Sequence, residues 1–420
     1  MAKQAESFAS RPSESELIHD WNEAPLLGRH IELDDETLRD GLQSPSVRTP
    51  SIEQKLEIVH LMASLGIDGA DIGLPAAGKG VFDDVLRITR EIVDQKLPIY
   101  PNAAARTMVR DCEPIVEISQ RTGMALEVAA FIGSSPIRQY AEAWDVDKLL
   151  FLTEECVTYC VKNGLPVMYV TEDTTRSKPE DLRRLYTCAI EAGAHRICVA
   201  DTVGHATPEG AARIIRFVKQ IVKDSGQEVK VDWHGHRDRS LSVANALAAA
   251  EAGADRLHGT ILGVGERVGN SPLDLILVNL QLLGWSDRDL HKLPDYCRLV
   301  AESTGVPFPD NYPAFGRDAF RTATGVHAAA IVKAREKGDE WLADRVYSSI
   351  PAGLIGCRQI IEVGPMSGLS NVAAWLRDHG IQPEEALVAA IFEKAKVASE
   401  VLTEAEIREI CRGFAVPSVV

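Results

Sequence analysis

Two histidines stand one residue apart in the stretch Asp232-Trp233-His234-Gly235-His236. If this stretch is a strand, residues i and i+2 project to the same face, so both imidazoles point the same way. Two imidazoles on one face can hold a divalent cation when a carboxylate from a neighbouring element completes the ligand set. The alternative is that both histidines are merely polar residues at the end of a strand. Their position in the fold distinguishes these two interpretations.

Charged and polar residues of catalytic type recur at the ends of other apolar runs. Arg39 could bind a ligand or pair with a nearby Asp, and Glu172 could act as an acid–base group or be a solvated loop acid. His258 lies inside an apolar pattern and is interpreted as a hydrogen-bonded core residue. The spacing of Gly263 and Gly265 favours a tight loop that a ligand can approach, not a dinucleotide-binding motif. The candidate set is Arg39, Asp40, Gln43, Arg106, Glu172, Thr202, Gly265, Glu266 and Asn270.

A repeated order of short strands and longer helices organises residues 30–285. Apolar or alternating runs predict eight strands, within 30–37, 68–73, 97–102, 125–132, 166–173, 195–201, 229–236 and 255–261. Helical periodicity follows each strand, starting near Ser51, Lys79, Asp111, Asp147, Pro179, Pro208, Ser242 and Asn270. Strict alternation implies a parallel sheet, and eight units of this length predict a (β/α)8 TIM barrel. A doubly wound open sheet is the competing interpretation, because periodicity alone does not reveal closure.

The barrel would bring the candidate residues to a common mouth. In TIM barrels the chemistry lies at the C-terminal ends of the strands and in the loops that follow them. Asp40 follows the first strand, His234 and His236 end the seventh, and Asn270 lies beyond the eighth. Because only the eighth strand separates the first from the seventh, these four residues are predicted to hold a divalent metal ion. Magnesium, manganese, cobalt and zinc all fit such ligands, and the sequence does not choose among them.

Composition limits the classes of partner. The 420 residues carry a formal net charge of −16, which argues against nucleic acid or an anionic membrane surface as a partner. Eight cysteines without a Cys-x-x-Cys pair predict reduced thiols. There is no apolar run near the ~20 residues of a membrane span and no signal-peptide core, so a cytoplasmic location is expected.

The chain divides into three predicted regions. Residues 1–27 form a polar extension with a possible short helix capped by Ser13 and Glu16. Residues 28–288 form the TIM-barrel catalytic domain. The strand–helix rhythm stops after Trp285, and residues 289–420 are predicted to be a mainly helical appendage of one or two small subdomains.

Several motifs resemble those of one enzyme family. They are DETLRDGLQSP, FIGSSPI, TEDTTR, ADTVGHATP, HGHRDRSLSVANALAAAEAGADRLHGT and GVGERVGNSPL. Together they are similar to the 2-isopropylmalate synthase and homocitrate synthase family, whose members are metal-dependent TIM-barrel enzymes that condense an acyl-CoA with a 2-oxo acid. The resemblance covers residues 30–285 with specific motifs and the appendage more loosely.

The resemblance implies roles for residues that were already candidates. Asp40, His234 and His236, with Asn270 adjacent or ligating, would hold the metal that polarises the ketone of the 2-oxo acid. An enolate formed from acetyl-CoA would attack this ketone, and hydrolysis would release CoA to leave a 2-substituted malate. Arg39 would stabilise developing negative charge, and Glu172 would assist proton transfer. Substrate contacts are expected from Gln43, Arg106, Ala129, Thr202, Gly265 and Glu266.

Two residues of the appendage also match the family. His327, in ATGVHAAAI, resembles a catalytic histidine, and Tyr347, in DRVYSSIPAGLIG, resembles the tyrosine that accompanies it. In the family these residues reach into the barrel of the partner subunit, which implies a homodimer. The stretch before His327 departs from the family, because Thr322-Ala323-Thr324 stands where His-Glu-Ser is usual.

Another departure from the family's sequence pattern leaves the identity of the acceptor 2-oxo acid open. Ala129-Ala130 stands where isopropylmalate-type synthases carry His-Thr, at the point where the side chain of the 2-oxo acid would lie. The resemblance therefore implies an isopropylmalate-synthase-like condensation, with homocitrate, citramalate, benzylmalate and phosphinomethylmalate types as alternatives. A retro-Claisen lyase of the hydroxymethylglutaryl-CoA lyase type is a further alternative. It is disfavoured because the strand-eight loop lacks the cysteine that such lyases carry. A barrel kept only for binding is the non-enzymatic alternative.

Overall fold

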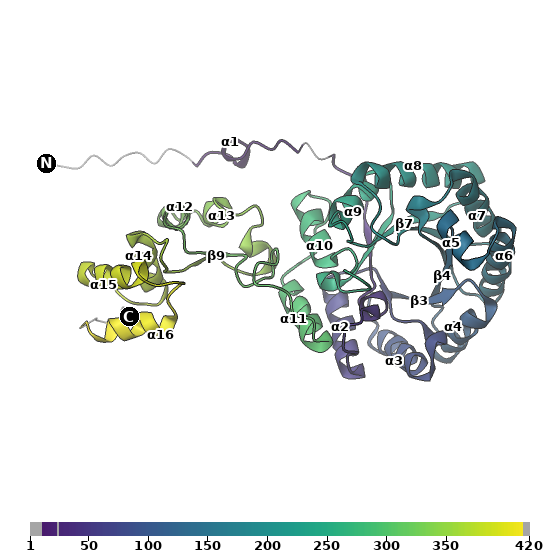
Figure 1. The fold of residues 1–420 in the computed structure, drawn as a ribbon, viewed down its shortest axis with the longest axis horizontal. Coiled ribbons are helices and arrows are strands. Elements are labelled where there is room, and N and C mark those ends of the chain that lie inside the picture. The colour runs from purple at the N-terminus through teal and green to yellow at the C-terminus, as the bar shows by residue number, and fades with distance from the viewer. Residues whose placement is uncertain (1–10, 23–24, 415–420) are drawn as a thin grey trace.

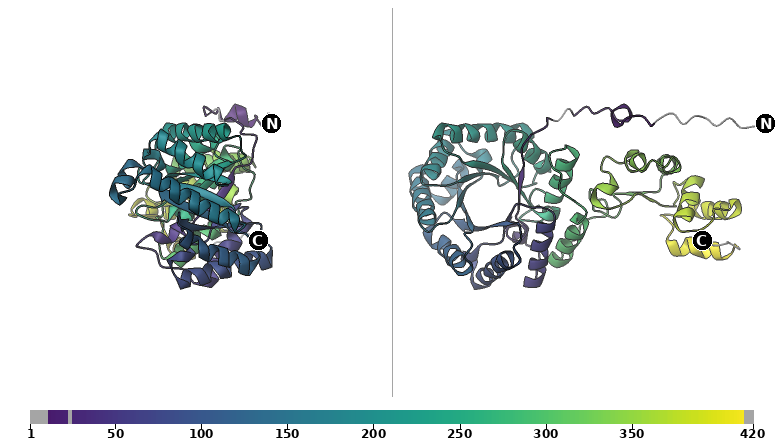
Figure 2. Two further views of the ribbon diagram at one scale, coloured as in Figure 1. Left: turned by 90° about the vertical axis from the view of Figure 1, so that its right-hand side faces the viewer. Right: turned by 180° about the vertical axis from the view of Figure 1, so that it is seen from behind.

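The computed structural model describes residues 11–22 and 25–414. A ring of strands enclosed by helices lies beside a smaller helical region (Figure 1). The right-hand view in Figure 2 shows the same division from behind, with the ring at one end of the molecule and the last helices at the other.

The ring is a closed barrel of eight parallel strands. They pair in chain order, and β1 closes the ring on β8 through pairs such as Leu33 with Leu257. Closure confirms the predicted (β/α)8 barrel and excludes the open doubly wound sheet. The strands are β1 (Glu32–Asp35), β2 (Gly69–Asp71), β3 (Tyr100–Arg106), β4 (Glu127–Gly133), β5 (Val167–Glu172), β6 (Arg196–Asp201), β7 (Lys230–Gly235) and β8 (Arg256–Gly259).

Helices enclose the ring, and most begin where the sequence predicts. The side chain of Ser51 caps α2, and that of Thr207 caps α8, whose first residue is Pro208. The short helix α5 is an addition that the periodicity did not predict. The helices of the barrel are α2 (Ile52–Ser64), α3 (Lys79–Gln95), α4 (Val109–Thr122), α5 (Pro136–Glu142), α6 (Val146–Lys162), α7 (Pro179–Glu191), α8 (Pro208–Ser225), α9 (Ser242–Glu251) and α10 (Leu273–Leu282).

Part of the barrel interior is filled by paired charges. Arg256 donates to Asp232 at 2.8 Å and to Glu127 at 2.7 Å, and all three residues are buried. Arg196 donates to the other oxygen of Asp232 at 2.7 Å and to Glu32 at 2.7 Å. Burial opposes the charge on Arg256, but the two carboxylates raise the pKa of its guanidinium well above the ordinary value. The network therefore consists of buried charges that each depend on a neighbour.

The barrel core continues past the predicted boundary at residue 288. Helix α11 (Leu293–Thr304) buries Leu293 and Val300 in the same hydrophobic cluster as the barrel, and Tyr296 Oη donates to Asp35 at 2.8 Å. Beyond α11, two small clusters are separate from the barrel core, one around Trp375 and one around Ile331. The remaining elements are β9 (Arg321–Thr322), α12 (Gly325–Glu336), α13 (Glu340–Arg345), β10 (Ile360–Ile361), α14 (Leu369–Asp378), α15 (Glu385–Lys396) and α16 (Glu404–Arg412).

The N-terminal segment runs beside the helical appendage. Ser13 caps the short helix α1 (Glu14–Leu17) in a capping box with Glu16, as the sequence predicts. Arg11 donates to Asp339 at 2.8 Å, and its guanidinium lies over the Trp341 ring. Within the predicted extension at 1–27, residues 1–10 and 23–24 lie outside the described residues.

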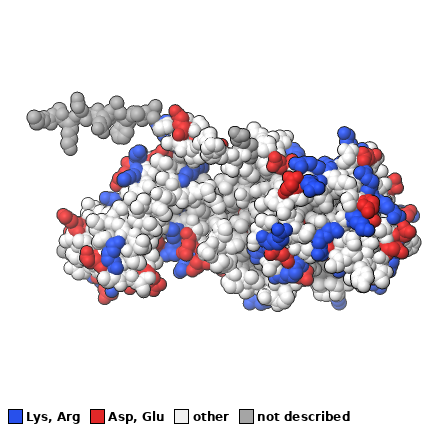
Figure 3. Space-filling view, turned by 45° about the horizontal axis from the view of Figure 1, so that its top comes forward, with Lys and Arg blue, Asp and Glu red and all other residues white. Residues whose placement is uncertain are grey.

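Acidic and basic side chains alternate over the face of the molecule drawn in Figure 3. Such a mixed face offers no broad basic stripe to a phosphate backbone. Within residues 11–22 and 25–414, no helix has the length and apolar character needed to cross a membrane.

The buried network makes a prediction about stability. Replacing Arg256 by Leu leaves Asp232 and Glu127 without their shared guanidinium, and breaking a buried pair in this way costs about 3–5 kcal/mol. Urea unfolding followed by circular dichroism should show a clearly lower midpoint. Arg183→Leu is the matched control, because Arg183 pairs with Asp224 at the surface and such pairs contribute little. Equal midpoints for the two variants would contradict the importance of the network.

Candidate active site

A cavity of about 200 Å³ lies at the C-terminal ends of the barrel strands. Nine of the residues that the sequence predicts for the site line it. These are Arg39, Asp40, Gln43, Ala129, Glu172, Thr202, His234, His236 and Glu266. The remaining lining residues are Glu36, Asp71, Ala104, Phe131, Met168, Val170, Cys198, Ala200 and His258.

Three predicted metal ligands converge on one side of the cavity. One donor atom each of Asp40, His234 and His236 lies within 4.8 Å of the others. His234 Nε2 is 3.5 Å and His236 Nε2 is 3.6 Å from Asp40 Oδ2. Donors about 2.0–2.2 Å from a shared ion lie roughly 3–3.5 Å apart. The spacing therefore fits two imidazole nitrogens and a carboxylate oxygen around one divalent cation.

Asn270 lies against the same group. Its Nδ2 donates to Asp40 Oδ2 at 2.6 Å, while its buried Oδ1 has no hydrogen-bond partner. An unpartnered buried oxygen next to the three donors is a further atom that a cation could satisfy. The loop reaches this position because Gly265 has a φ of +155°, and a Cβ at Gly265 would overlap Asn270 Oδ1.

Glu36, which the sequence patterns did not single out, lies against one of the two imidazoles. Glu36 Oε2 lies 2.7 Å from His234 Nδ1, so His234 can keep its proton on Nδ1 and present Nε2 to the cavity. Burial opposes the charge on Glu36, but His234 and Arg39 hold the pKa of its carboxyl well below the ordinary value. The only sequence signal was its place in the run Asp34-Asp35-Glu36, where strand alternation does not identify one acid as the partner.

His258 is buried between two carboxylates and, with Glu36 and His234, forms a second group of neighbouring potential donors. Its Nδ1 lies 2.9 Å from Glu36 Oε1, and its Nε2 lies 3.1 Å from Asp232 Oδ2. Burial lowers the tendency of His258 to be charged, yet Asp34 and the two bonded carboxylates raise its pKa to about 10. With both nitrogens bonded to carboxylates, His258 is the hydrogen-bonded core residue that the sequence predicts.

Arg39 brings positive charge to the cavity among three acids. Its Nε donates to Asp71 at 2.6 Å, Nη1 lies 3.3 Å from Asp40 Oδ1, and Nη2 lies 3.4 Å from Glu36 Oε1. Burial raises the pKa of Asp71 to about 7, although Arg39 acts in the opposite direction. The guanidinium is thus held in one place beside the predicted metal ligands.

Glu172 and Thr202 line the cavity at the ends of β5 and β6. Burial raises the pKa of Glu172, and Arg138, whose Nη2 lies 3.8 Å away, partly offsets this. A carboxyl group with a raised pKa can act as a proton donor or acceptor. The Thr202 hydroxyl accepts a hydrogen bond from the Asp173 backbone amide at 2.8 Å, which fixes the position of the hydroxyl.

Five predicted residues do not line this cavity, and one of them is Asn270, whose contact with Asp40 is described above. Arg106 forms a bidentate pair with Asp111 at 2.6 and 3.0 Å, and about half of its side chain is exposed. Gly265 lines a neighbouring cavity of about 440 Å³. His327 and Tyr347 stack on each other in the appendage, with ring centroids 4.1 Å apart, and both are exposed.

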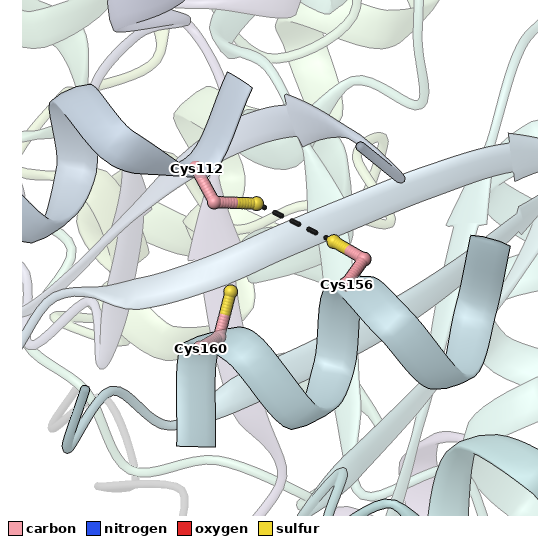
Figure 4. A group of neighbouring side chains, drawn as sticks. All are labelled: Cys112, Cys156 and Cys160. Atoms are coloured by element: carbon pink, nitrogen blue, oxygen red, sulfur yellow. Dashed lines mark hydrogen bonds between the residues drawn. The ribbon is translucent and has the colours of Figure 1, made fainter. Parts of the chain in front are cut away.

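A third cluster of potential ligands lies away from the cavity, between α4 and α6 (Figure 4). Cys112, Cys156 and Cys160 are all buried, and their sulfur atoms lie within 4.8 Å of one another. They come from the outer helices and not from the strand ends, and none lines the cavity described above. Buried thiols of this kind pack as small apolar side chains.

Comparisons with known proteins define the family. Residues 30–300 match the HMGL-like family, and the chain belongs to it. It is 31% identical to homocitrate synthase AksA of Methanopyrus kandleri, over 90% of this chain and 91% of that one. It is also 31% identical to 2-isopropylmalate synthase of Sulfolobus acidocaldarius, over 89% and 92% of the two chains. The fold is similar to that of the Bacillus subtilis HMG-CoA lyase, with a TM-score of 0.56 and 18% identity over 68% of this chain and 96% of that one.

The geometry of the three converging donors predicts the effect of removing one. His234→Ala should abolish tight binding of Mn²⁺ or Zn²⁺, because one imidazole and the Glu36 contact that orients it are lost together. Metal bound per subunit can be measured by equilibrium dialysis and mass spectrometry. His60→Ala is a suitable control, since His60 pairs with Glu91 on the helices outside the ring. An unchanged metal content in the His234 variant would show that the ion binds elsewhere.

Proposed function

We propose that the protein is a metal-dependent synthase that condenses acetyl-CoA with a 2-oxo acid, after which water hydrolyses the thioester to give a 2-substituted malate and CoA. The observation that carries the proposal is the convergence of Asp40, His234 and His236 beside Arg39 in one cavity at the barrel mouth. The synthases among its relatives support the same class of reaction. An isopropylmalate-type product is the first expectation, with the homocitrate, citramalate, benzylmalate and phosphinomethylmalate types and the lyase reaction as alternatives.

Asp40, His234 and His236, with Asn270 beside them, would hold the divalent ion. When bound, this ion would supply Lewis-acid polarisation of the acceptor ketone. Arg39 would stabilise the negative charge that develops as the new carbon–carbon bond forms, because its guanidinium is already fixed by Asp71. A fixed donor of this kind requires no reorganisation when the charge appears.

Glu172 would move a proton during the reaction. Its carboxyl lines the cavity, and burial raises its pKa, which favours a role as proton donor or acceptor. Gln43, Thr202 and Glu266 lie on the same cavity and would orient the substrates by hydrogen bonds. Arg106, paired with Asp111, is the weakest of the proposed substrate contacts.

The neighbouring cavity of about 440 Å³ is a suitable place for acetyl-CoA. Gly265 lies on this cavity and the adjacent Glu266 lies on the first, so the strand-eight loop joins the two. Arg237 and Arg267 line the second cavity and would attract the phosphates of CoA. The thioester could then extend past the loop toward Arg39.

We also propose a homodimer in which His327 and Tyr347 serve the partner's barrel. The two rings stack and are exposed on the appendage, outside the cavity of their own chain. An exposed pair of this type can reach a second subunit in a symmetric dimer, in which each chain contributes to both sites.

The proposed reaction releases a thiol, which gives a direct test. Metal-loaded protein incubated with acetyl-CoA and a set of 2-oxo acids should release free CoA, detected with a thiol reagent. Arg39→Ala should lower kcat by about 10²–10³-fold, as loss of a fixed charge-stabilising donor does in other enzymes. Arg183→Ala on the outer helices should leave the rate unchanged. No thiol release with any acid would refute the synthase.

The proposed dimer predicts complementation between two defective subunits. Arg39→Ala and His327→Ala homodimers should each be nearly inactive. A heterodimer purified with two different affinity tags should regain about half of the wild-type activity, because one of its two sites keeps both residues. Activity no greater than that of the parents would contradict sharing of the site between subunits.

A further inference from the structure

The cavity has one apolar wall. Of the residues that line it, seven have apolar side chains: Ala104, Ala129, Phe131, Met168, Val170, Cys198 and Ala200. They come from the continuous arc of strands β3–β6, whereas the candidate metal ligands come from β7 and from the segments after β1 and β8 (Figure 1). A 2-oxo acid bound to the ligand side through its carboxylate and ketone would extend its side chain toward this wall.

The lining offers no spare positive charge. Among the described residues of the cavity, Arg39 is the only lysine or arginine, and it already contacts Asp71, Asp40 and Glu36. Five carboxylates line the same space: Glu36, Asp40, Asp71, Glu172 and Glu266. A second anionic group on the substrate would therefore be desolvated among acids without a partner, which is unfavourable.

The arginines nearest in sequence to the wall are also paired with acids. Arg106 forms its bidentate pair with Asp111 at the start of α4. Arg138 lies 3.5 Å from Glu142 and 3.8 Å from Glu172. Neither lines the cavity, so neither supplies a cation that faces the apolar wall.

Small side chains recess the wall. Ala104 on β3 pairs with Ala129 on β4, and Ala129 pairs with Met168 on β5. Ala200 lies nearer the C-terminal end of β6 and also lines the cavity. Ala129, Met168 and Cys198 form a buried apolar cluster of their own, separate from the main core. Each substrate methylene buried against such a surface should improve binding about fourfold.

We infer that the acceptor is a 2-oxo acid whose side chain is uncharged, apolar and larger than a methyl group. This inference rests on the proposed condensation and narrows its substrate class. It favours branched aliphatic and aryl 2-oxo acids over pyruvate. It disfavours 2-oxoglutarate and phosphorus-bearing pyruvates, which carry a second anionic group.

Two measurements on the wild-type protein test the substrate class. Calorimetry with Mn²⁺-loaded protein gives the binding of each acid, and thiol release with acetyl-CoA gives kcat/KM. The probes are pyruvate, 2-oxoisovalerate, 4-methyl-2-oxopentanoate, phenylpyruvate, 2-oxoglutarate and phosphonopyruvate. The kcat/KM of the best branched or aryl acid should be about tenfold or more higher than that of pyruvate. Its advantage over 2-oxoglutarate and phosphonopyruvate should be larger still.

A change of wall volume provides a second test. Ala129→Leu should lower kcat/KM for the larger acids by about tenfold or more relative to kcat/KM for pyruvate, because the added side chain takes up the space that a larger substrate side chain needs. Ala405→Leu is the matched control, because Ala405 is exposed on α16. Circular dichroism checks the fold of both variants, and Ala129→Val offers a smaller change if the Leu variant does not fold.

The outcomes separate the inference from the proposed reaction. Thiol release that is fastest with 2-oxoglutarate, phosphonopyruvate or pyruvate overturns the substrate class and leaves the condensation standing. Selective binding of the apolar acids without thiol release supports the substrate class and refutes the condensation. Neither binding nor release with any acid overturns both.

Discussion

The proposed site depends most on the contacts that the Glu36 carboxylate makes with two histidines. It lies 2.7 Å from His234 on one side and 2.9 Å from His258 on the other. His258 in turn binds Asp232, which holds Arg256 and Arg196. Because each buried charge is stabilised by its neighbours, the network ties β1, β7 and β8 to one another and, through Glu127 and Arg196, to β4 and β6. Strands β1, β7 and β8 also carry or precede the four candidate metal ligands, so the ion pairs inside the barrel set the geometry at its mouth.

At the level of the cavity, the barrel lining divides into a polar and an apolar half. The arc of β7, β8 and β1 carries acids and imidazoles, and the arc of β3–β6 presents Ala104, Ala129, Met168 and Cys198 at the level of the cavity. Acids outnumber cations around the cavity, and burial raises the pKa of Asp71 to about 7. A bound divalent cation would offset this excess and allow an anionic 2-oxo acid to enter. The polar half can therefore serve binding and chemistry while the apolar half accommodates a side chain.

Sequence patterns predicted the regular parts of this arrangement well. Short apolar or alternating runs located all eight strands, and His234 and His236 both line the cavity, as side-chain alternation on one strand predicts. Features that depend on contacts far apart in sequence could not be read this way. Glu36 is one acid of three in a row, and only the folded barrel brings it to His234. Arg106 ends a strand, as a mouth residue should, yet Asp111 pairs with it. The barrel core also extends into α11, where Tyr296 binds Asp35 from a segment without strand periodicity.

The division into halves also explains why the reaction is easier to infer than the acceptor. A change at Glu36, Asp232 or His258 leaves another buried charge without its partner, so these positions tolerate few side chains. A change at Ala129 or Ala200 alters only volume and apolar contact, which a barrel can accommodate at a lower free-energy cost. This difference in tolerance is consistent with the names of two relatives, a homocitrate synthase and a 2-isopropylmalate synthase, which are each 31% identical to this chain. The polar residues would thus determine the reaction at the ketone, and the small residues of β3, β4 and β6 would determine which 2-oxo acid is accepted.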